Sequence, residues 1–80
     1  MMSNLNVDQI RSFLAVLESG SFTAAAQVLG LRQSTVSGHI ARLERTLERP
    51  LLMRDTHRVA PTPDGQAMIG FARDVLEAHD

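Results

Sequence analysis

The chain has 80 residues, no cysteine and a formal net charge of −1 at pH 7. A domain of this size buries only about 60% of the surface of its unfolded chain, and without cysteine it has no disulfide or thiolate ligand to stabilise it. Its apolar stretches are short, and its start lacks a basic patch followed by an apolar run, which excludes a membrane-spanning helix and a secretory signal. We therefore expect one small cytoplasmic unit folded by apolar packing.

The net charge conceals a separation of signs along the chain. Residues 31–58 hold six arginines and three acidic residues (6 − 3 = +3), whereas the remainder holds two arginines and six acidic residues (2 − 6 = −4). Basic excess is typical of nucleic-acid binders, so only this middle segment fits a polyanion. All basic residues are arginine, which suits bidentate contacts with phosphate or guanine, although a GC-rich genome favours arginine codons as well.

Two helices are predicted before residue 31. The first begins at Val7, with Asn6 as its N-cap and Gln9 placed to reach back as in a capping box, and it ends near Gly20. The second covers about 23–29 and has Ser21 as a plausible cap. Gly30 should end it in a left-handed conformation, with Leu31 folding back as an apolar plug.

The third helix is predicted from about Gln33 to Leu47, and it has two unlike faces. Aliphatic residues at four- and three-residue steps form the buried face: Val36, Ile40, Leu43 and Leu47. The opposite face is small, polar and basic: Ser34, Gly38, Ala41, Arg42 and Arg45, with Ser37 on its flank and Gln33 and Thr35 at its N-terminal rim. Such a face can enter a groove about 12 Å wide. The alternative, an ordinary solvated face, usually carries long Glu and Lys side chains instead.

Two short strands and a last helix are predicted after Pro50. The strands are 51–54 and 58–61, joined by a turn at 55–57, and Pro61 restricts the second strand to a short or edge position. Thr62-Pro63-Asp64 then has the cap, proline and acid order that starts a helix. An apolar stripe continues almost to its end and is expected to pack partly on a second subunit: Met68, Phe71, Ala72, Val75 and Leu76.

The segment from Phe13 to Gly65 resembles the DNA-binding domain of LysR-type transcriptional regulators. The motifs that carry the resemblance are 13–16 (FLAV), 20–26 (GSFTAAA), 33–37 (QSTVS), 40–44 (IARLE), 51–54 (LLMR) and 60–65 (APTPDG). It implies a mainly α fold, namely a winged helix-turn-helix of three helices and a two-stranded wing over 1–61. A linker and dimerisation helix over 62–80 would follow, truncated before an effector-binding domain.

The resemblance also implies functional roles. Gln33, Ser34, Thr35 and Ser37 would meet bases or phosphates from a recognition helix in the major groove of double-stranded DNA. The wing would bring Arg54, His57 and Arg58 to the minor groove or to phosphates. The expected assembly is a homodimer, with a tetramer left open for the full-length protein, and a small-molecule effector would act only through the absent domain.

Four positions depart from the family pattern. Arg32 stands where Ser or Thr usually caps the recognition helix, so a cap worth about 1 kcal/mol is lost, although Arg32 could reach a phosphate. Gly38 replaces a long polar residue, which puts one base contact in doubt. His39 stands where Gln is frequent and is assigned a phosphate contact over a solvated position, and Pro61 replaces a common Leu. Arg42 on the basic face completes the candidate site.

Other chemistry is not expected. The three histidines are too far apart for a metal-binding pair on a helix, and no glycine-rich phosphate loop or nucleophile elbow is present, so we expect no metal, cofactor or catalysis. The overall acidity leaves a second function open, a winged helix that serves only as a protein-interaction or dimerisation module.

Overall fold

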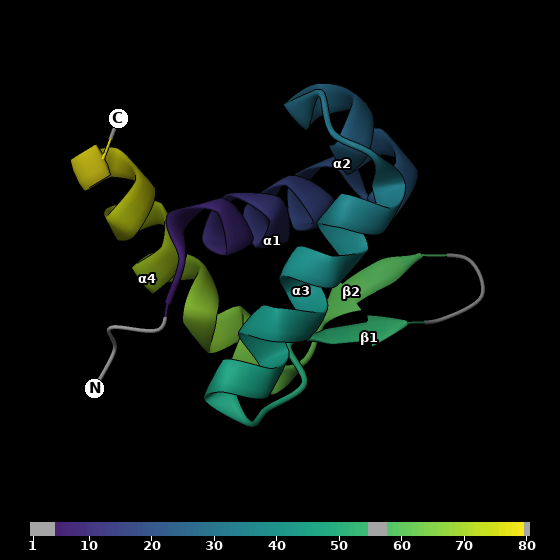
Figure 1. Ribbon diagram of the computed structural model, residues 1–80. Coiled ribbons are helices and arrows are strands. Elements are labelled where there is room, and N and C mark those ends of the chain that lie inside the picture. Colours follow the sequence, from purple (N-terminus) through teal and green to yellow (C-terminus); the bar gives the residue numbers. More distant parts are fainter. Residues whose placement is uncertain (1–4, 55–57, 80) are drawn as a thin grey trace.

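The computed structural model describes residues 5–54 and 58–79 and contains four helices and one two-stranded antiparallel sheet (Figure 1). The elements in chain order are α1 (Val7–Ser19), α2 (Phe22–Leu29), α3 (Gln33–Leu47), β1 (Leu52–Arg54), β2 (Val59–Pro61) and α4 (Pro63–His79). This arrangement confirms the predicted fold class, a mainly helical winged helix-turn-helix followed by a long helix. In the described residues, no helix is both long and apolar enough to cross a lipid bilayer.

Helix α1 lies at the centre of the molecule and contacts α2, α3, α4 and β2 (Figure 1). Its buried apolar residues are Ile10, Phe13, Leu14 and Val16, and Phe13 and Val16 have no exposed surface. The Asn6 side-chain oxygen accepts hydrogen bonds from the N–H groups of Asp8 and Gln9 at 2.7 and 3.4 Å, which confirms the N-cap. The expected reciprocal bond is not made, because Gln9 Oε1 is buried without a partner among the described residues.

Helix α2 ends in the predicted left-handed turn. Gly30 has φ +69°, and the N–H of Leu31 donates to the carbonyl oxygen of Ala26 at 2.9 Å, which together form a Schellman motif. The Leu31 side chain does not act as the expected plug, since 40% of its surface is exposed. The backbone bonds therefore close the tight turn between α2 and α3 without the Leu31 side chain.

The wing is one residue shorter on each strand than the sequence predicts. Leu52 pairs with Pro61 and Arg54 with Val59 in an antiparallel register. Pro61 lies at the end of its three-residue strand, as expected from its missing N–H. The turn at 55–57 lies outside the described residues.

Helix α4 is held against the wing by a close backbone contact. Thr62 caps it, because its Oγ1 accepts from the N–H of Gly65 at 2.9 Å and donates to the carbonyl oxygen of Pro50 at 2.7 Å. A Cβ at Gly65 would lie 2.0 Å from the carbonyl oxygen of Leu51, so only glycine fits there. Gly65 therefore has a packing role, because it lets α4 approach the backbone at Leu51.

Candidate nucleic-acid interface

The two faces of α3 are separated as the sequence predicts. Val36, Ile40 and Leu43 have no exposed surface and pack in the core with α1 and α2. The opposite side of the helix is exposed along its whole length: Ser34, Gly38, Ala41, Arg42 and Arg45. We call these five residues the outer face of α3.

The predicted contact residues near this face are mostly accessible. Arg32, Gln33 and Thr35 are exposed at the N-terminal end of α3, whereas Ser37 and His39 are half-buried on the flank. Apart from the backbone of α3 itself and the two neighbouring residues, no heavy atom of the described residues lies within 4 Å of the place that a Cβ of Gly38 would take. The backbone of α3 is therefore open to close approach at Gly38.

The N-terminus of α3 lacks a side-chain cap, as predicted from Arg32. The backbone of Arg32 has the extended conformation of an N-cap, with φ −76° and ψ 149°, but its side chain makes no capping hydrogen bond. The next residue, Gln33, does have a side-chain partner, since the Thr23 hydroxyl donates to its Oε1 at 3.1 Å. This bond links α2 to the first residue of α3.

His39 has an internal partner that the sequence did not reveal. Its Nδ1 lies 2.7 Å from Oγ of Ser12, a residue of α1 with no exposed surface. One ring nitrogen is therefore used inside the protein, and only Nε2 is left for an outside group. The phosphate contact of His39 remains a prediction.

Arg54 is also held by the protein. Its Nη2 lies 3.5 Å from Glu44 Oε1, and its guanidinium lies over the ring of Phe22, 5.3 Å from the centroid. Glu44 Oε2 accepts from the N–H groups of Leu51 and Leu52 at 2.7 and 3.2 Å, so this carboxylate fastens the start of the wing to α3. Half of the Arg54 side chain is still exposed, and its predicted DNA contact stays a prediction.

The remaining predicted contact residues are those of the wing, and the arginines of the outer face add to them. Arg58 is exposed at the wing, and His57 lies outside the described residues. In residues 5–54 and 58–79 no ion pair engages Arg42 or Arg45, whereas Arg54 and Arg73 are paired with carboxylates. The charge of the outer face is therefore not neutralised from within. Periodicity had placed Arg45 there, but nothing in the sequence indicated the roles of Glu44 or Ser12, which depend on contacts between distant segments.

The apolar stripe of α4 packs mainly on its own chain, which corrects one prediction. Ala72 has no exposed surface in the single chain and cannot contact a second subunit. Met68, Val75 and Leu76 are partly buried against the same core, and Phe71 is 42% exposed. The stripe is inward because α4 folds back onto α1, a contact that the sequence did not predict.

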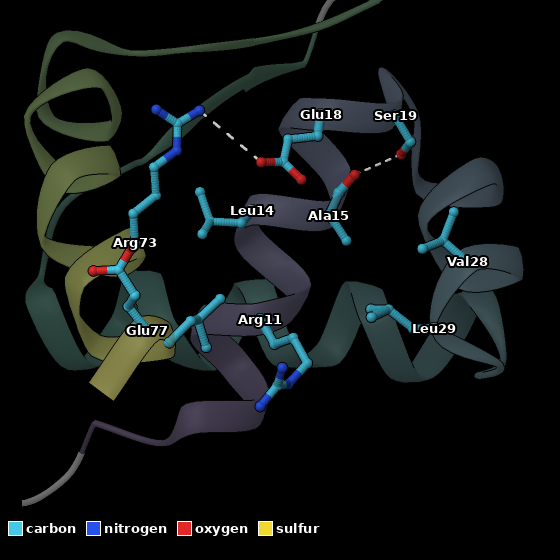
Figure 2. Close-up of a pocket in the computed structure, with 10 residues that line it drawn as sticks. Arg11, Leu14, Ala15, Glu18, Ser19, Val28, Leu29, Arg73 and Glu77 are labelled. Carbon is cyan, nitrogen blue, oxygen red and sulfur yellow. Dashed lines mark hydrogen bonds and ion pairs between the residues drawn. The ribbon is translucent and has the colours of Figure 1, made fainter. Parts of the chain in front are cut away.

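A groove remains open between α1, α2 and α4. Figure 2 shows its apolar floor, which includes Leu14 and Leu29, and its charged rim, where Arg73 and Glu18 lie 3.9 Å apart. Val28 also lines the groove and is 73% exposed. This groove and Phe71 are the accessible apolar surface around α4.

The part of the chain that the structure describes contains no group of three or more His, Cys, Asp or Glu side chains that could hold a metal ion.

Comparison with known proteins places these features in a family. The model of the family described as "Bacterial regulatory helix-turn-helix protein, lysR family" matches residues 7–66. The chain is 41% identical over 75 residues to the HTH-type transcriptional regulator PtxR of Pseudomonas aeruginosa, covering 94% of this chain and 24% of PtxR. It is 46% identical over 71 residues to a probable hydrogen peroxide-inducible genes activator of Mycobacterium xenopi, covering 89% of this chain and 38% of that protein.

Solved structures with the same fold include complexes with DNA. The structure titled BenM_DBD/catB site 1 DNA complex has a TM-score of 0.90 and 36% identity, and the match covers 95% of this chain and 85% of that one. The CbnR_DBD-DNA complex has a TM-score of 0.89 and 32% identity, and the match covers 94% and 86% of the two chains. The chain thus spans most of these separate domains but about a quarter of the curated relative PtxR.

Proposed function

Because the chain belongs to the lysR family of bacterial regulatory helix-turn-helix proteins, we propose that it binds double-stranded DNA in a sequence-specific manner as part of a transcription regulator. Helix α3 enters the major groove, and the wing approaches the minor groove or the flanking phosphates. The DNA complexes of the similar BenM and CbnR domains support this assignment. Its closest competitor, a module that binds only protein, has no comparable support.

The exposed, small outer face of α3 is the observation on which the proposal rests. Aliphatic residues hold the other side of α3 in the core, so the helix presents its polar side at a fixed orientation. The major groove is about 12 Å wide and accommodates one helix, whose hydrogen-bonding side chains read the base edges. Ser34 and Arg42 are therefore assigned to bases or nearby phosphates, with Gln33, Thr35 and Ser37 beside them.

Phosphate contacts are assigned to the exposed arginines whose charge is least engaged by other protein groups. Arg42 and Arg45 have no carboxylate partner among the described residues, and Arg32 is exposed at the positive end of the helix dipole. Arg58 extends this surface toward the wing. Arg54 has a divided role, because Glu44 and Phe22 hold its guanidinium and leave only part of it for DNA.

Selection of bound duplexes from a random pool tests the proposal. We expect a consensus with half-sites of two-fold symmetry, and an affinity that falls steeply with salt because bound phosphates release counterions. Arg42→Ala combined with Arg45→Ala should reduce the slope of log affinity against log salt by about 2, roughly one per lost phosphate contact. Asp74→Asn is the control, because it changes the charge of an exposed α4 residue that does not line the groove, and it should leave the slope unchanged. A flat salt dependence or the absence of a consensus contradicts the proposal.

We assign dimerisation to the open groove and to the accessible apolar side chains of α4, and the occupant is a second copy of this chain. The rim of the groove carries both signs, from Arg11 and Arg73 on one hand and Glu18 and Glu77 on the other. In a two-fold contact a basic residue of one copy can face an acidic residue of the other, so a rim with both signs is compatible with self-association. Residues 62–80 thus act as the linker helix, through Met68, Phe71, Val75 and Leu76 and without Ala72.

The oligomeric state tests this assignment. Val28→Lys and Phe71→Lys should each weaken association in sedimentation experiments without DNA, because each places a charge in an apolar contact. Met53→Lys is the matched control, since Met53 is an exposed apolar residue of the wing (51%) away from α4. If all three variants associate equally well, the dimer contact lies elsewhere on the molecule and the assignment is wrong.

The remaining properties follow from this function. We assign the protein to the cytoplasm, where bacterial DNA is accessible, and we assign no catalytic step to any of its residues. The response to a small-molecule effector is placed outside residues 5–79, in line with the family resemblance, and a tetramer of the whole protein remains open.

A further inference from the structure

The hydrogen bond between Thr23 and Gln33 lies at the edge of the proposed DNA-binding surface. Thr23 is in the first turn of α2, Gln33 is the first residue of α3, and both side chains are exposed. The Thr23 hydroxyl donates to Gln33 Oε1 at 3.1 Å. One lone pair of Gln33 Oε1 is therefore used, and this oxygen is turned toward Thr23, before any DNA is bound.

The direction in which Oε1 is held determines what this amide presents to a base. In a planar amide, the oxygen and the NH₂ group branch from the same carbon, so an amide that turns Oε1 toward Thr23 turns its two N–H donors away from it. Near this amide the first backbone N–H groups of α3 are also without a side-chain acceptor, because Arg32 makes no capping bond. This end of the helix is therefore rich in hydrogen-bond donors.

We propose that Thr23 orients Gln33 so that it reads a base only as a hydrogen-bond donor. Guanine offers two acceptors in the major groove, N7 and O6, and thymine offers O4, so these bases match the two N–H groups. Adenine is normally recognised by glutamine through both the oxygen and the NH₂ group, at N6 and N7, and this pairing requires Oε1 to face the base rather than Thr23. Thr23 is thus a specificity-determining residue that acts through Gln33, and it selects guanine or thymine over adenine.

This inference rests on the proposed function, since it requires α3 to lie in the major groove. It also differs from a direct role of Thr23 at the DNA backbone. A threonine that only contacts phosphate changes affinity for all sequences alike, because phosphates carry no sequence information. A threonine that orients Gln33 changes the preference at one base pair.

The test begins by locating that base pair. Duplexes are selected from a random pool with the wild-type chain and with Gln33→Ala, and the position that loses its preference is the one that Gln33 reads. We expect guanine or thymine at this position with the wild-type chain. If guanine is selected, its replacement by 7-deazaguanine removes the N7 acceptor and should weaken binding. If thymine is selected, its replacement by uracil removes the methyl group but keeps O4 and should leave binding unchanged.

Three chains are then compared on duplexes that differ only at that base pair. Thr23→Val removes the hydroxyl at nearly constant shape. We expect the affinity for the adenine duplex, divided by the affinity for the selected duplex, to rise about tenfold over the wild-type ratio, because discrimination of this size is typical of a bidentate contact. Thr23→Ser keeps a hydroxyl and should retain the wild-type preference. Thr23 is exposed, so neither variant disturbs the core.

The possible failures are distinguishable. If the wild-type chain selects no consensus, the proposed function fails and this inference with it. If a consensus exists but the wild-type chain prefers adenine at the Gln33 position, or Gln33→Ala leaves every preference intact, the inference is overturned alone. Uniform weakening by Thr23→Val across all four duplexes, or an unchanged preference, also overturns it.

Discussion

Replacing Gly38 by alanine should make the protein more stable and its DNA binding weaker. Gly38 is exposed in the middle of α3, and a Cβ there would meet no atom within 4 Å. Alanine is favoured over glycine in a helix interior by about 0.5–1 kcal/mol, and nothing in the chain opposes this gain. For a domain of this size, that gain raises the melting temperature by roughly 2–8 °C.

The expected loss of affinity comes from the same methyl group. It extends about 1.5 Å from the helix backbone on the outer face, where Gly38 has no side chain. If the backbone at Gly38 touches the base edges, the helix must retreat by a similar distance. Losing one hydrogen bond to a base then weakens binding by about 1–1.4 kcal/mol, which is roughly five- to tenfold.

Thermal unfolding and titration of the selected duplex measure the two effects separately. Gly70→Ala is the matched control, because Gly70 is exposed in α4 and its Cβ would also meet nothing within 4 Å. We expect a similar rise in melting temperature for Gly70→Ala, with unchanged affinity and an unchanged oligomeric state. If Gly38→Ala gains stability and binds the duplex as tightly as the wild-type chain, the close approach of α3 at Gly38 is wrong.

Three further substitutions test the local structure. Arg32→Ser supplies the missing cap of α3 and should raise the free energy of unfolding by up to about 1 kcal/mol; an unchanged melting temperature would mean that solvent already satisfies this helix end. Gly65→Ala should lower stability by about 1–3 kcal/mol in denaturant titrations, because its Cβ would overlap the carbonyl oxygen of Leu51, and wild-type stability would refute that contact. Glu48→Gly should raise stability by about 0.5–1 kcal/mol, since Glu48 ends α3 with φ +56°, where a side chain is strained, and a loss of stability would contradict this reasoning.

The sequence alone was enough to place the helices and the two faces of α3. The caps at Asn6 and Ser21 and the spacing of Val36, Ile40 and Leu43 act over a few residues, so the periodicity and the helix ends can be read locally. The same local pattern separated the exposed outer face from the core. The missing cap at Arg32 could be predicted for this reason as well.

Contacts between distant segments could not be predicted in this way. Only the folded chain brings Ser12 to His39 and places Thr23 beside Gln33, because each pair joins two helices whose relative positions depend on the whole core. The inward direction of Ala72 has the same origin, since an apolar stripe has the same pattern whether it packs on its own chain or on a partner. Periodicity thus determines which side of a helix is apolar, but tertiary packing determines what covers that side and which polar groups are still free to bind.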